Sequence, residues 1–483
     1  MSAAPLWTAP AMAQAMRASI HGAPAEAVTG LSIDSRSIAP GEAYFAIKGE
    51  VHDGHDFVAA ALEAGAALAV VAAAQRGKFA ADAPLLVVDD VLDGLVDLAR
   101  ASRARLSAKV IAVTGSVGKT STKEALRCVL SAQGPTHASV ASFNNHWGVP
   151  LSLARCPASV RFAIFEIGMN HPGEIEPLVK LVRPDVAIIT TVEPVHLEYL
   201  GSIEAIADAK AEVFTGLEPG GAVVLNRDNA QFSRLRARAE QLGIARIVTF
   251  GTDAASDARL RDVALHATSS AVHATIMGHD ITYKLGMPGR HIAMNSLAVL
   301  AAASLVGADL ALAALALAQI EAASGRGVRR VLDLGREPGD AEALLIDESY
   351  NANPASMAAA LNVLGQAAVG AQGRRIAVLG DMLELGATGP ALHQGIADVV
   401  KADNIDLVYC CGPLMRNLWE ALTTGKRGGY AENAAGLEAQ VVAAVRAGDA
   451  IMIKGSLGSK MKTIVSALEK RFPGRTALDD AAV

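Results

Sequence analysis

The sequence has few cysteines, few aromatic residues and no long apolar run. Its four cysteines, Cys128, Cys156, Cys410 and Cys411, form no Cys-x-x-Cys pair in 483 residues. We therefore expect free thiols in a reducing cytoplasm. The first residues lack the basic start and apolar centre of a signal peptide, and no uncharged apolar run of about 18 residues could span a membrane. These absences predict a soluble cytoplasmic protein without membrane insertion.

An excess of positive charge is also missing. The chain carries 43 Lys and Arg residues against 49 Asp and Glu residues, a formal net charge of −6. Because nucleic-acid-binding proteins usually have a basic excess, this balance argues against a nucleic-acid partner, whereas a small anionic ligand needs only local positive charge. Hydrophobic residues make up 51% of the chain. That content can fill large cores, and the length predicts two to four domains.

Short apolar runs alternate with helical stretches along most of the chain, which predicts the α/β fold class. Residues 1–108 mix short strands with Ala-rich helices and suggest a small α/β domain. Residues 109–325 predict a central P-loop ATPase-type domain with a mostly parallel sheet, to which short runs at 262–286 add an antiparallel part. Residues 326–483 predict a Rossmann-like, doubly wound domain. The expected strands include 43–47, 67–71, 85–88, 110–113, 162–167, 186–191, 222–225, 344–346, 376–379, 407–410 and 450–453.

The stretch 110–123 predicts a buried strand, a glycine-containing turn and the first turn of a helix. Gly115 and Gly118 would let backbone N–H groups approach a phosphate, Lys119 would add a point charge, and the Thr120 hydroxyl could hold magnesium. The loop Gly-Ser-Val-Gly-Lys-Thr has two residues between its glycines, where the common P-loop has four. The sequence therefore predicts a phosphate site of a shortened type.

Three further residues could serve this site to different degrees. Glu166 ends an apolar strand beside the loop, where a carboxylate can hold magnesium; a helix cap or a salt bridge is the alternative. His196 follows the next strand, so metal ligation is open there beside the commoner structural role. Lys210 lies on an expected helix, and its pattern indicates no more than a solvated cation.

Other polar strings lie where strands are expected to end. Residues 142–148 place two amides, a histidine and an indole in one loop, and residues 347–354 lie between a strand and a helix, where turn and N-cap chemistry is the alternative. Lys454-Gly-Ser could bind an anion or simply begin a helix. His291 and Asn295 have the i, i+4 spacing that lets two side chains face one ligand.

Together these strings resemble the Mur ligase family of ATP-dependent amide-forming enzymes. The resemblance covers essentially the whole chain and includes the short phosphate loop. The strings that carry it are Phe143-Asn-Asn-His-Trp-Gly-Val-Pro, Glu166-Ile-Gly-Met-Asn-His-Pro-Gly-Glu-Ile, Ser349-Tyr-Asn-Ala-Asn-Pro-Ala-Ser-Met and Leu379-Gly-Asp-Met-Leu-Glu-Leu-Gly, with Asp34-Ser-Arg, Lys48-Gly-Glu and Asp53-Gly-His-Asp in the first domain.

The resemblance implies a monomeric ligase with three domains. The first would bind the uridine diphosphate of UDP-MurNAc-tripeptide, the second ATP, and the third D-alanyl-D-alanine. ATP would phosphorylate the carboxylate of the tripeptide, and the amine of D-alanyl-D-alanine would attack the acyl phosphate. The product would be the pentapeptide precursor of peptidoglycan, with ADP and phosphate.

The resemblance also implies roles for individual residues. Lys119, Glu166, His196 and Lys210 would be catalytic. Two magnesium ions would be served by Thr120, Glu166, His196 and a Lys210 that can be carbamylated. ATP would be contacted by Gly115, Ser116, Val117, Gly118, Lys119, Thr120, Ser121, Asn295, Arg326, Asp347 and Asn351. The peptide substrate would be contacted by Ser35, Arg36, Asn144 and Asn145.

One departure and two alternatives stay open. The family's Lys-Gly-Ser-Arg is Lys454-Gly-Ser-Leu457 here, so the arginine is missing, with Lys460 as a candidate replacement. A sister ligase that adds a diamino acid is the nearest alternative, and the Tyr350-Asn-Ala-Asn-Pro and Gly380-Asp-Met strings argue against it. A P-loop switch ATPase is the alternative from another class, but the chain has no obvious Walker-B run with an Asp-x-x-Gly switch.

Overall fold

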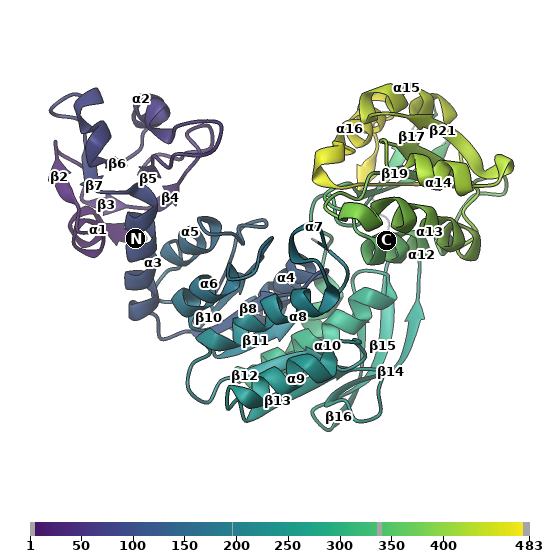
Figure 1. Cartoon of the computed structure of the whole chain (residues 1–483), viewed down its shortest axis with the longest axis horizontal. Helices are drawn as coiled ribbons and strands as arrows, with labels where there is room; N and C mark the ends of the chain where they lie inside the picture. The colour runs from purple at the N-terminus through teal and green to yellow at the C-terminus, as the bar shows by residue number, and fades with distance from the viewer. Residues whose placement is uncertain (1–4, 196, 336–340, 477–483) are drawn as a thin grey trace.

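The computed structural model describes residues 5–195, 197–335 and 341–476. Three α/β parts follow one another along the chain, and the central part lies between the other two (Figure 1). The fold therefore belongs to the predicted α/β class with three parts. None of the helices in these ranges is long and apolar enough to cross a membrane.

The N-terminal part is built on a sheet in the strand order β2-β7-β6-β5-β4, in which β4 to β7 run parallel and β2 is antiparallel at one edge. The expected strands 43–47, 67–71 and 85–88 are confirmed to within two residues. The short β1 and β3 pair with each other instead. The elements are β1 (Trp7–Thr8), α1 (Ala9–Met16), β2 (Ser19–His21), β3 (Ala27–Val28), β4 (Gly30–Ser32), β5 (Glu42–Phe45), η1 (Gly54–Phe57), α2 (Val58–Glu63), β6 (Leu68–Ala72), η2 (Ala73–Lys78), β7 (Leu85–Val88) and α3 (Val91–Arg105), where η marks a 3-10 helix.

The central part contains a long mixed sheet in the order β16-β15-β14-β13-β12-β11-β8-β10-β9. Strands β8 to β13 pair in parallel, as predicted. The runs near 262–286 are antiparallel as expected, but β14 pairs in parallel with β13, so they extend the central sheet. The elements are β8 (Lys109–Thr114), α4 (Lys119–Ser131), β9 (Thr136–Ala138), α5 (Gly148–Ala154), β10 (Phe162–Glu166), α6 (Ile175–Val182), β11 (Val186–Ile189), α7 (Leu197–Leu200), α8 (Ile203–Ala211), η3 (Glu212–Gly216), β12 (Ala222–Asn226), α9 (Phe232–Gln241), β13 (Arg246–Gly251), β14 (Ala258–Leu265), β15 (Ser270–Ile276), β16 (His279–Leu285), α10 (Arg290–Leu305), α11 (Leu310–Ala316) and η4 (Leu317–Gln319).

The C-terminal part contains a second mixed sheet in the order β21-β20-β19-β22-β18-β17-β23. The first five of these strands are parallel, which agrees with the doubly wound prediction, and β17 and β23 add an antiparallel edge. The elements are β17 (Val328–Asp333), β18 (Glu342–Glu348), α12 (Pro354–Gly365), β19 (Arg375–Gly380), η5 (Gly386–Thr388), α13 (Gly389–Ala402), β20 (Leu407–Cys411), α14 (Arg416–Ala421), η6 (Thr424–Lys426), β21 (Arg427–Ala431), α15 (Ala434–Ala444), β22 (Ala450–Lys454), η7 (Leu457–Ser459), α16 (Lys462–Arg471) and β23 (Arg475–Thr476).

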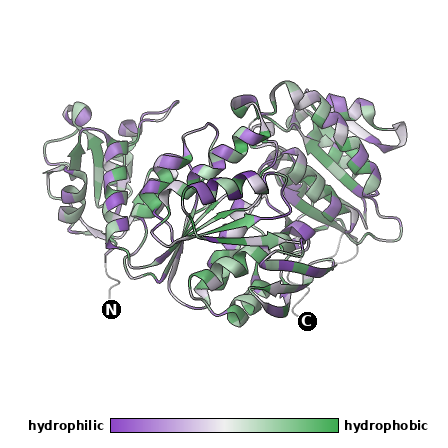
Figure 2. Cartoon of the chain, turned by 60° about the horizontal axis from the view of Figure 1, so that its bottom comes forward, coloured by the Kyte–Doolittle hydropathy of each residue, from purple (hydrophilic) through white to green (hydrophobic). Residues whose placement is uncertain are grey.

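Apolar strands covered by helices explain why these sheets form. The side chains of β10, β11 and β22 are almost completely buried, and the inner strands of the sheets are mostly green, that is hydrophobic, in Figure 2. Strands buried on both faces favour parallel pairing, because crossover helices then cover each face. Parallel pairing brings the carboxyl ends of β8, β10 and β11 to one edge, where the phosphate loop and Glu166 lie.

Side-chain hydrogen bonds fasten the N-terminal part to the central part. Ser102 on α3 donates to the carbonyl of Leu153 at the end of α5 at 2.7 Å, and the indole of Trp7 donates to the carbonyl of Ala154 at 2.9 Å. Arg155 donates to the carbonyl of Leu31 at 2.7 Å. Because these bonds are mostly buried, the two parts form one packed unit.

Candidate active site

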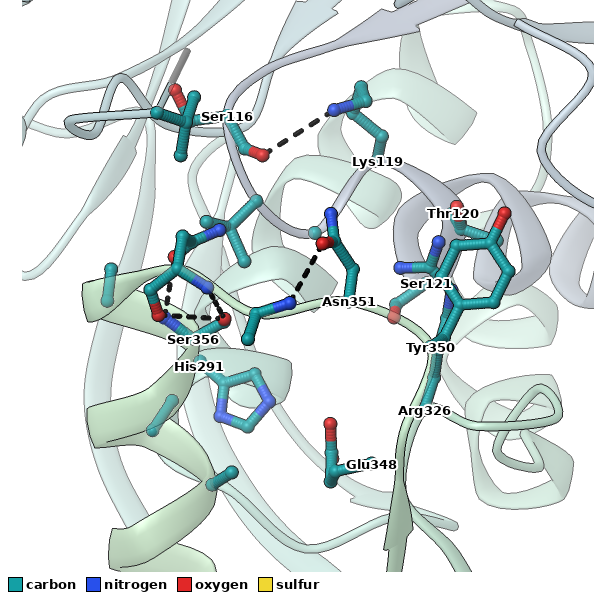
Figure 3. A pocket seen from close by; sticks show the side chains of 18 of the residues that line it. Ser116, Lys119, Thr120, Ser121, His291, Arg326, Glu348, Tyr350, Asn351 and Ser356 are labelled. Carbon is teal, nitrogen blue, oxygen red and sulfur yellow. Dashed lines mark hydrogen bonds between the residues drawn. The ribbon is translucent and has the colours of Figure 1, made fainter. Parts of the chain in front are cut away.

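A cavity of about 600 Å³ lies between the central and C-terminal parts. Its central wall carries the phosphate loop, and its opposite wall carries the ends of β18 and β22 with the start of α12. Figure 3 shows Ser116 and Lys119 on one side of this space and His291 and Glu348 on another. The predicted residues that line it are Ser116, Val117, Gly118, Lys119, Thr120, Ser121, Asn144, Glu166, Asn295, Arg326 and Asn351.

Two glycines shape the phosphate loop between β8 and α4. Gly115 has φ +144°, and a Cβ there would lie 2.0 Å from the hydroxyl of Thr190. Gly118 has φ +83°, and a Cβ there would lie 2.5 Å from the amide nitrogen of Asn295. Both backbone angles and both close approaches require glycine. The loop is also held by the Thr190 hydroxyl, which donates to the carbonyl of Val117 at 2.6 Å.

Lys119 folds back onto its own loop. Its ammonium donates to the carbonyl of Gly115 at 2.7 Å and reaches the carbonyl of Ser116 at 3.5 Å (Figure 3). Burial lowers the pKa of Lys119, while the carboxylate of Glu166 opposes that shift. The ammonium group thus lies beside the loop, where an anionic phosphate would accept its hydrogen bonds in place of these carbonyl groups.

Glu166 is buried and both of its carboxylate oxygens accept hydrogen bonds. Thr120 donates to Oε2 at 2.9 Å, and the side-chain amide of Asn144 donates to Oε1 at 2.7 Å. Ser142 lies 3.4 Å from the Thr120 hydroxyl, and Arg326 donates to Ser142 at 3.3 Å. A continuous polar network therefore runs from the helix that starts at the loop to the connection between the two parts.

The oxygen groups in this network suit magnesium. Within the described ranges no group of three or more His, Cys, Asp or Glu side chains could hold a metal ion. Magnesium, however, often uses one or two carboxylates and completes its shell with waters and substrate phosphates. Glu166 and Thr120 at hydrogen-bond distance from each other fit that pattern. His196, predicted as a further ligand, lies outside the described residues.

Lys210 on α8 is buried, contrary to the solvated cation that its helical pattern indicates. The side chain is 2% exposed. Burial lowers the pKa of Lys210 well below its usual value, and the charge of Lys119 adds to that effect. No acceptor bonds to its ammonium group among the residues that the structure describes. Burial at this position therefore disfavours the charged form of the Lys210 amine.

The far end of the cavity gathers aromatic, amide and imidazole groups. The guanidinium of Arg326 lies 4.2 Å from the centre of the Tyr350 ring. Figure 3 shows the two side chains beside each other. His291 and Asn295 project from α10, as their spacing predicts. Burial lowers the pKa of the His291 imidazole, while the carboxylate of Glu348 opposes that shift. Flat and polar groups of this kind suit a nucleotide base and ribose.

Of two adjacent acids on β18, Glu348 and not the predicted Asp347 lines the cavity. Asp347 is buried, accepts from the hydroxyl of Ser349 at 2.6 Å and pairs with Lys462 at 2.8 Å. Glu348 instead pairs with Lys454 at 3.2 Å. Neighbouring residues of a strand face opposite sides of a sheet, so the alternation along β18 could have separated the two.

The remaining predicted residues lie outside the cavity lining. Arg36 is exposed in the N-terminal part and makes two bonds to the carboxylate of Asp34, at 2.9 and 2.7 Å. Ser35 is its neighbour there. Asn145 accepts from the backbone N–H of Gly148 at the start of α5. Gly115, Lys210 and Lys460 do not line the cavity, whereas Leu457 does and is 67% exposed. Glu348 and Tyr350 also line the cavity; both belong to the 347–354 string, but neither was assigned a role of its own from the sequence. Thr190 and Arg329 line it too and lie outside the polar strings that the sequence reasoning singled out.

Comparison with known proteins gives one consistent result. Three family models match: "Mur ligase family, catalytic domain" over residues 27–103, "Mur ligase middle domain" over 113–303, and "Mur ligase, glutamate ligase domain" over 336–457. Two relatives, from Bacillus subtilis and Escherichia coli, are both named UDP-N-acetylmuramoyl-tripeptide–D-alanyl-D-alanine ligase. Each is 33% identical, and each alignment covers 91% of this chain and 93% of the relative.

Solved structures agree with the sequence relatives. A crystal structure of MurF from Acinetobacter baumannii has a TM-score of 0.81 at 29% identity and covers 96% of this chain and 99% of its own. MurF from Thermotoga maritima in complex with ADP has a TM-score of 0.72 at 25% identity, with 92% and 98% covered.

Proposed function

The chain belongs to the Mur ligase family, and from this premise we propose that it joins D-alanyl-D-alanine to UDP-MurNAc-tripeptide in an ATP-dependent reaction. One observation carries the proposal: the phosphate loop, the Thr120–Glu166–Asn144 network and the end of β22 line a single cavity. Relatives named for this reaction match along more than nine tenths of the chain. The ADP complex of a similar protein supports ATP as the nucleotide.

Activation would take place at the phosphate loop. A carboxylate oxygen of the tripeptide attacks the γ-phosphorus of ATP, and ADP leaves. Lys119 and the N–H groups at the start of α4 stabilise the charge on the transferred phosphoryl group. Glu166 and Thr120 would hold magnesium, which neutralises phosphate charge when bound. Asn144 keeps the Glu166 carboxylate oriented.

Amide formation would follow at the opposite wall. The amine of D-alanyl-D-alanine attacks the acyl carbon, and a tetrahedral intermediate forms. The intermediate loses phosphate, and the amine gives up a proton as the amide forms. A cavity enclosed by two walls excludes water from the acyl phosphate, which would otherwise be hydrolysed.

We propose that Lys210 carries a carbamate. Its buried amine, when uncharged, can attack CO2: an N–C bond forms, one C–O π bond opens and the nitrogen releases one proton. The product is a carboxylate that could serve a second magnesium ion together with His196. Burial without an acceptor among the described residues supports this, because an ammonium group there would be costly.

The other site assignments are also proposals. Asn295, Arg326 and Asn351 would contact ATP, with Glu348 in the place expected for Asp347. Ser35 and Arg36 would contact the UDP end of the substrate, with Asn144 and Asn145 nearer the peptide. The proposed domains are 1–108, 109–325 and 326–483, and each family match falls within one of them.

We further propose a monomer that works in the cytoplasm. Support for the monomer is that one chain supplies both walls of the cavity. Support for the cytoplasm is that all four cysteines are free thiols and that the proposed reaction consumes ATP.

The experiment is a phosphate-release assay with ATP, UDP-MurNAc-tripeptide and each candidate amine. Release should require D-alanyl-D-alanine, and mass spectrometry should detect the pentapeptide product. A sister ligase would instead use the dipeptide precursor and a diamino acid. Release without any amine would indicate a P-loop ATPase and refute the proposal.

A matched pair of variants ties the activity to the loop. Lys119→Met should abolish phosphate release, because it removes the cation at the phosphates. Lys109→Met changes an exposed lysine at the first residue of β8, the strand that leads into the loop. Lys109 pairs there with Asp185, and this variant should leave the rate unchanged.

A further inference from the structure

Lys123 is a completely buried lysine that the proposed reaction does not use. It lies one turn beyond Lys119 and Thr120 on α4, and its side chain has no exposed surface. Lysine is rarely buried to this extent unless its charge is paired. Solvent therefore does not stabilise the charge of this ammonium group, and partners within the protein must do so.

All three donors of the Lys123 ammonium have partners. It donates to the carbonyls of Ser139 and Ala141, each at 2.7 Å, and lies 2.8 Å from a carboxylate oxygen of Glu124. A lysine ammonium has three donors, so none remains for a ligand. Two of the three bonds go to one turn of the backbone, which follows β9 and which we call the 139–145 turn.

The 139–145 turn needs support from outside. Ala141 has φ +48°, a left-handed conformation that is unfavourable for a residue with a Cβ. Val140 is 57% exposed, so packing does little to hold that part of the turn. The carbonyls on either side of Val140 are the two that Lys123 binds. Lys123 thus holds the strained backbone at 139–141 in place through these two hydrogen bonds.

The same turn supplies side chains to the active site. Asn144 donates to Glu166 Oε1, and Ser142 links Thr120 to Arg326. Thr120, which holds the other oxygen of Glu166, lies on α4 itself. One helix therefore controls both oxygens: Oε2 directly through Thr120, and Oε1 through the 139–145 turn.

We propose that Lys123 is a positioning residue that fixes the orientation of the Glu166 carboxylate through the 139–145 turn and Asn144. Because Lys123 and Thr120 are three residues apart on one helix, the turn and the phosphate loop keep a constant separation. This inference deepens the proposed function, since it names what orients the carboxylate on which phosphoryl transfer depends.

Lys123→Met tests the inference, because methionine fills most of the same space without a donor. Hydrogen exchange in the protein without nucleotide or metal should become faster in peptides that cover residues 139–145 and stay unchanged in α8 and β12. The kcat for amide formation should fall by about tenfold or more, since small misplacements of catalytic groups have effects of this size. If Lys123→Met does not fold, Lys123→Gln takes its place: its shorter amide cannot make both carbonyl bonds, so exchange of residues 139–145 should still become faster and kcat should still fall.

Glu124→Gln is the matched control. It removes the ion pair of Lys123 but leaves both carbonyl bonds, so exchange of the turn and kcat should stay close to those of the unmodified protein. If Glu124→Gln has the same effect as Lys123→Met, then charge pairing and not support of the turn explains the burial, and the inference is wrong.

A double-mutant cycle separates positioning from general destabilisation. In an Asn144→Ala background, Lys123→Met should reduce kcat only slightly further, because the link to Glu166 is already lost. Equal factors in both backgrounds, or unchanged exchange of the turn, would overturn the inference. If the unmodified protein shows no amine-dependent phosphate release, the proposed function fails, whereas the exchange result still tests the support of the turn.

Discussion

Replacing Gly118 by alanine tests whether the short phosphate loop and Asn295 form one site. Gly118 has φ +83°, and a new Cβ would lie 2.5 Å from Nδ2 of Asn295. Real Cβ contacts essentially never fall below 3.0 Å, so Asn295 must move by at least the difference, 0.5 Å. The left-handed backbone adds a conformational cost of roughly 1–2 kcal/mol for alanine.

Gly173→Ala supplies the control for the backbone cost. Gly173 also has φ +83°, but nothing lies within 4 Å of its new Cβ. Both variants should therefore lose similar thermal stability. Only Gly118→Ala should lower kcat/KM for ATP, by about tenfold or more, because a displacement of this size misplaces groups at the site. The assay is phosphate release with ATP varied at saturating peptide and amine. A kcat/KM for Gly118→Ala within twofold of that for Gly173→Ala would refute the reasoning.

Two further predictions concern buried titratable groups. Lys210→Ala should lose activity and regain part of it when a short carboxylic acid is added. Lys180→Ala, which removes an exposed lysine, should have no effect on activity. Full activity of Lys210→Ala without added acid would contradict the carbamate. His393 accepts from the N–H of Met382 and donates to the carbonyl of Gly389, and burial lowers its pKa, an effect that the nearby Asp381 opposes. Since the unfolded chain then binds a proton more readily below about pH 6.5, the stability that neutral His393 provides should decline as the pH falls below that value. Thermal midpoints should therefore differ less between the unmodified protein and His393→Leu at low pH than near neutrality, and a constant difference would disprove the role of His393.

The strands and the phosphate loop could be predicted because their signals are local. Each buried strand is a continuous apolar run, and the run before the loop was expected over 110–113 and extends over Lys109–Thr114. The glycines mark the turn, and Lys119 and Thr120 follow at once. Nothing distant along the chain is needed to place them.

Burial of charged residues could not be predicted in the same way. Lys210 and Lys123 lie on helices whose patterns resemble exposed faces, and other segments cover them. The carbonyls that bind Lys123 come 16 and 18 residues later. For Asp347 and Glu348 the signal was present, since adjacent strand residues alternate, but which face meets the cavity depends on how the two parts pack.

The junction between the two walls has a mechanical consequence. Among the described residues, no strand of the central sheet pairs with one of the C-terminal sheet, and the connection contains Gly325 and Gly327, both with positive φ. Each wall can thus keep its internal distances while the angle between the walls changes. An inhibitor that contacts only one wall would bind equally well at any angle between the walls. An inhibitor that contacts both walls would also fix that angle, so its affinity would include the free energy needed to bring the walls to that angle.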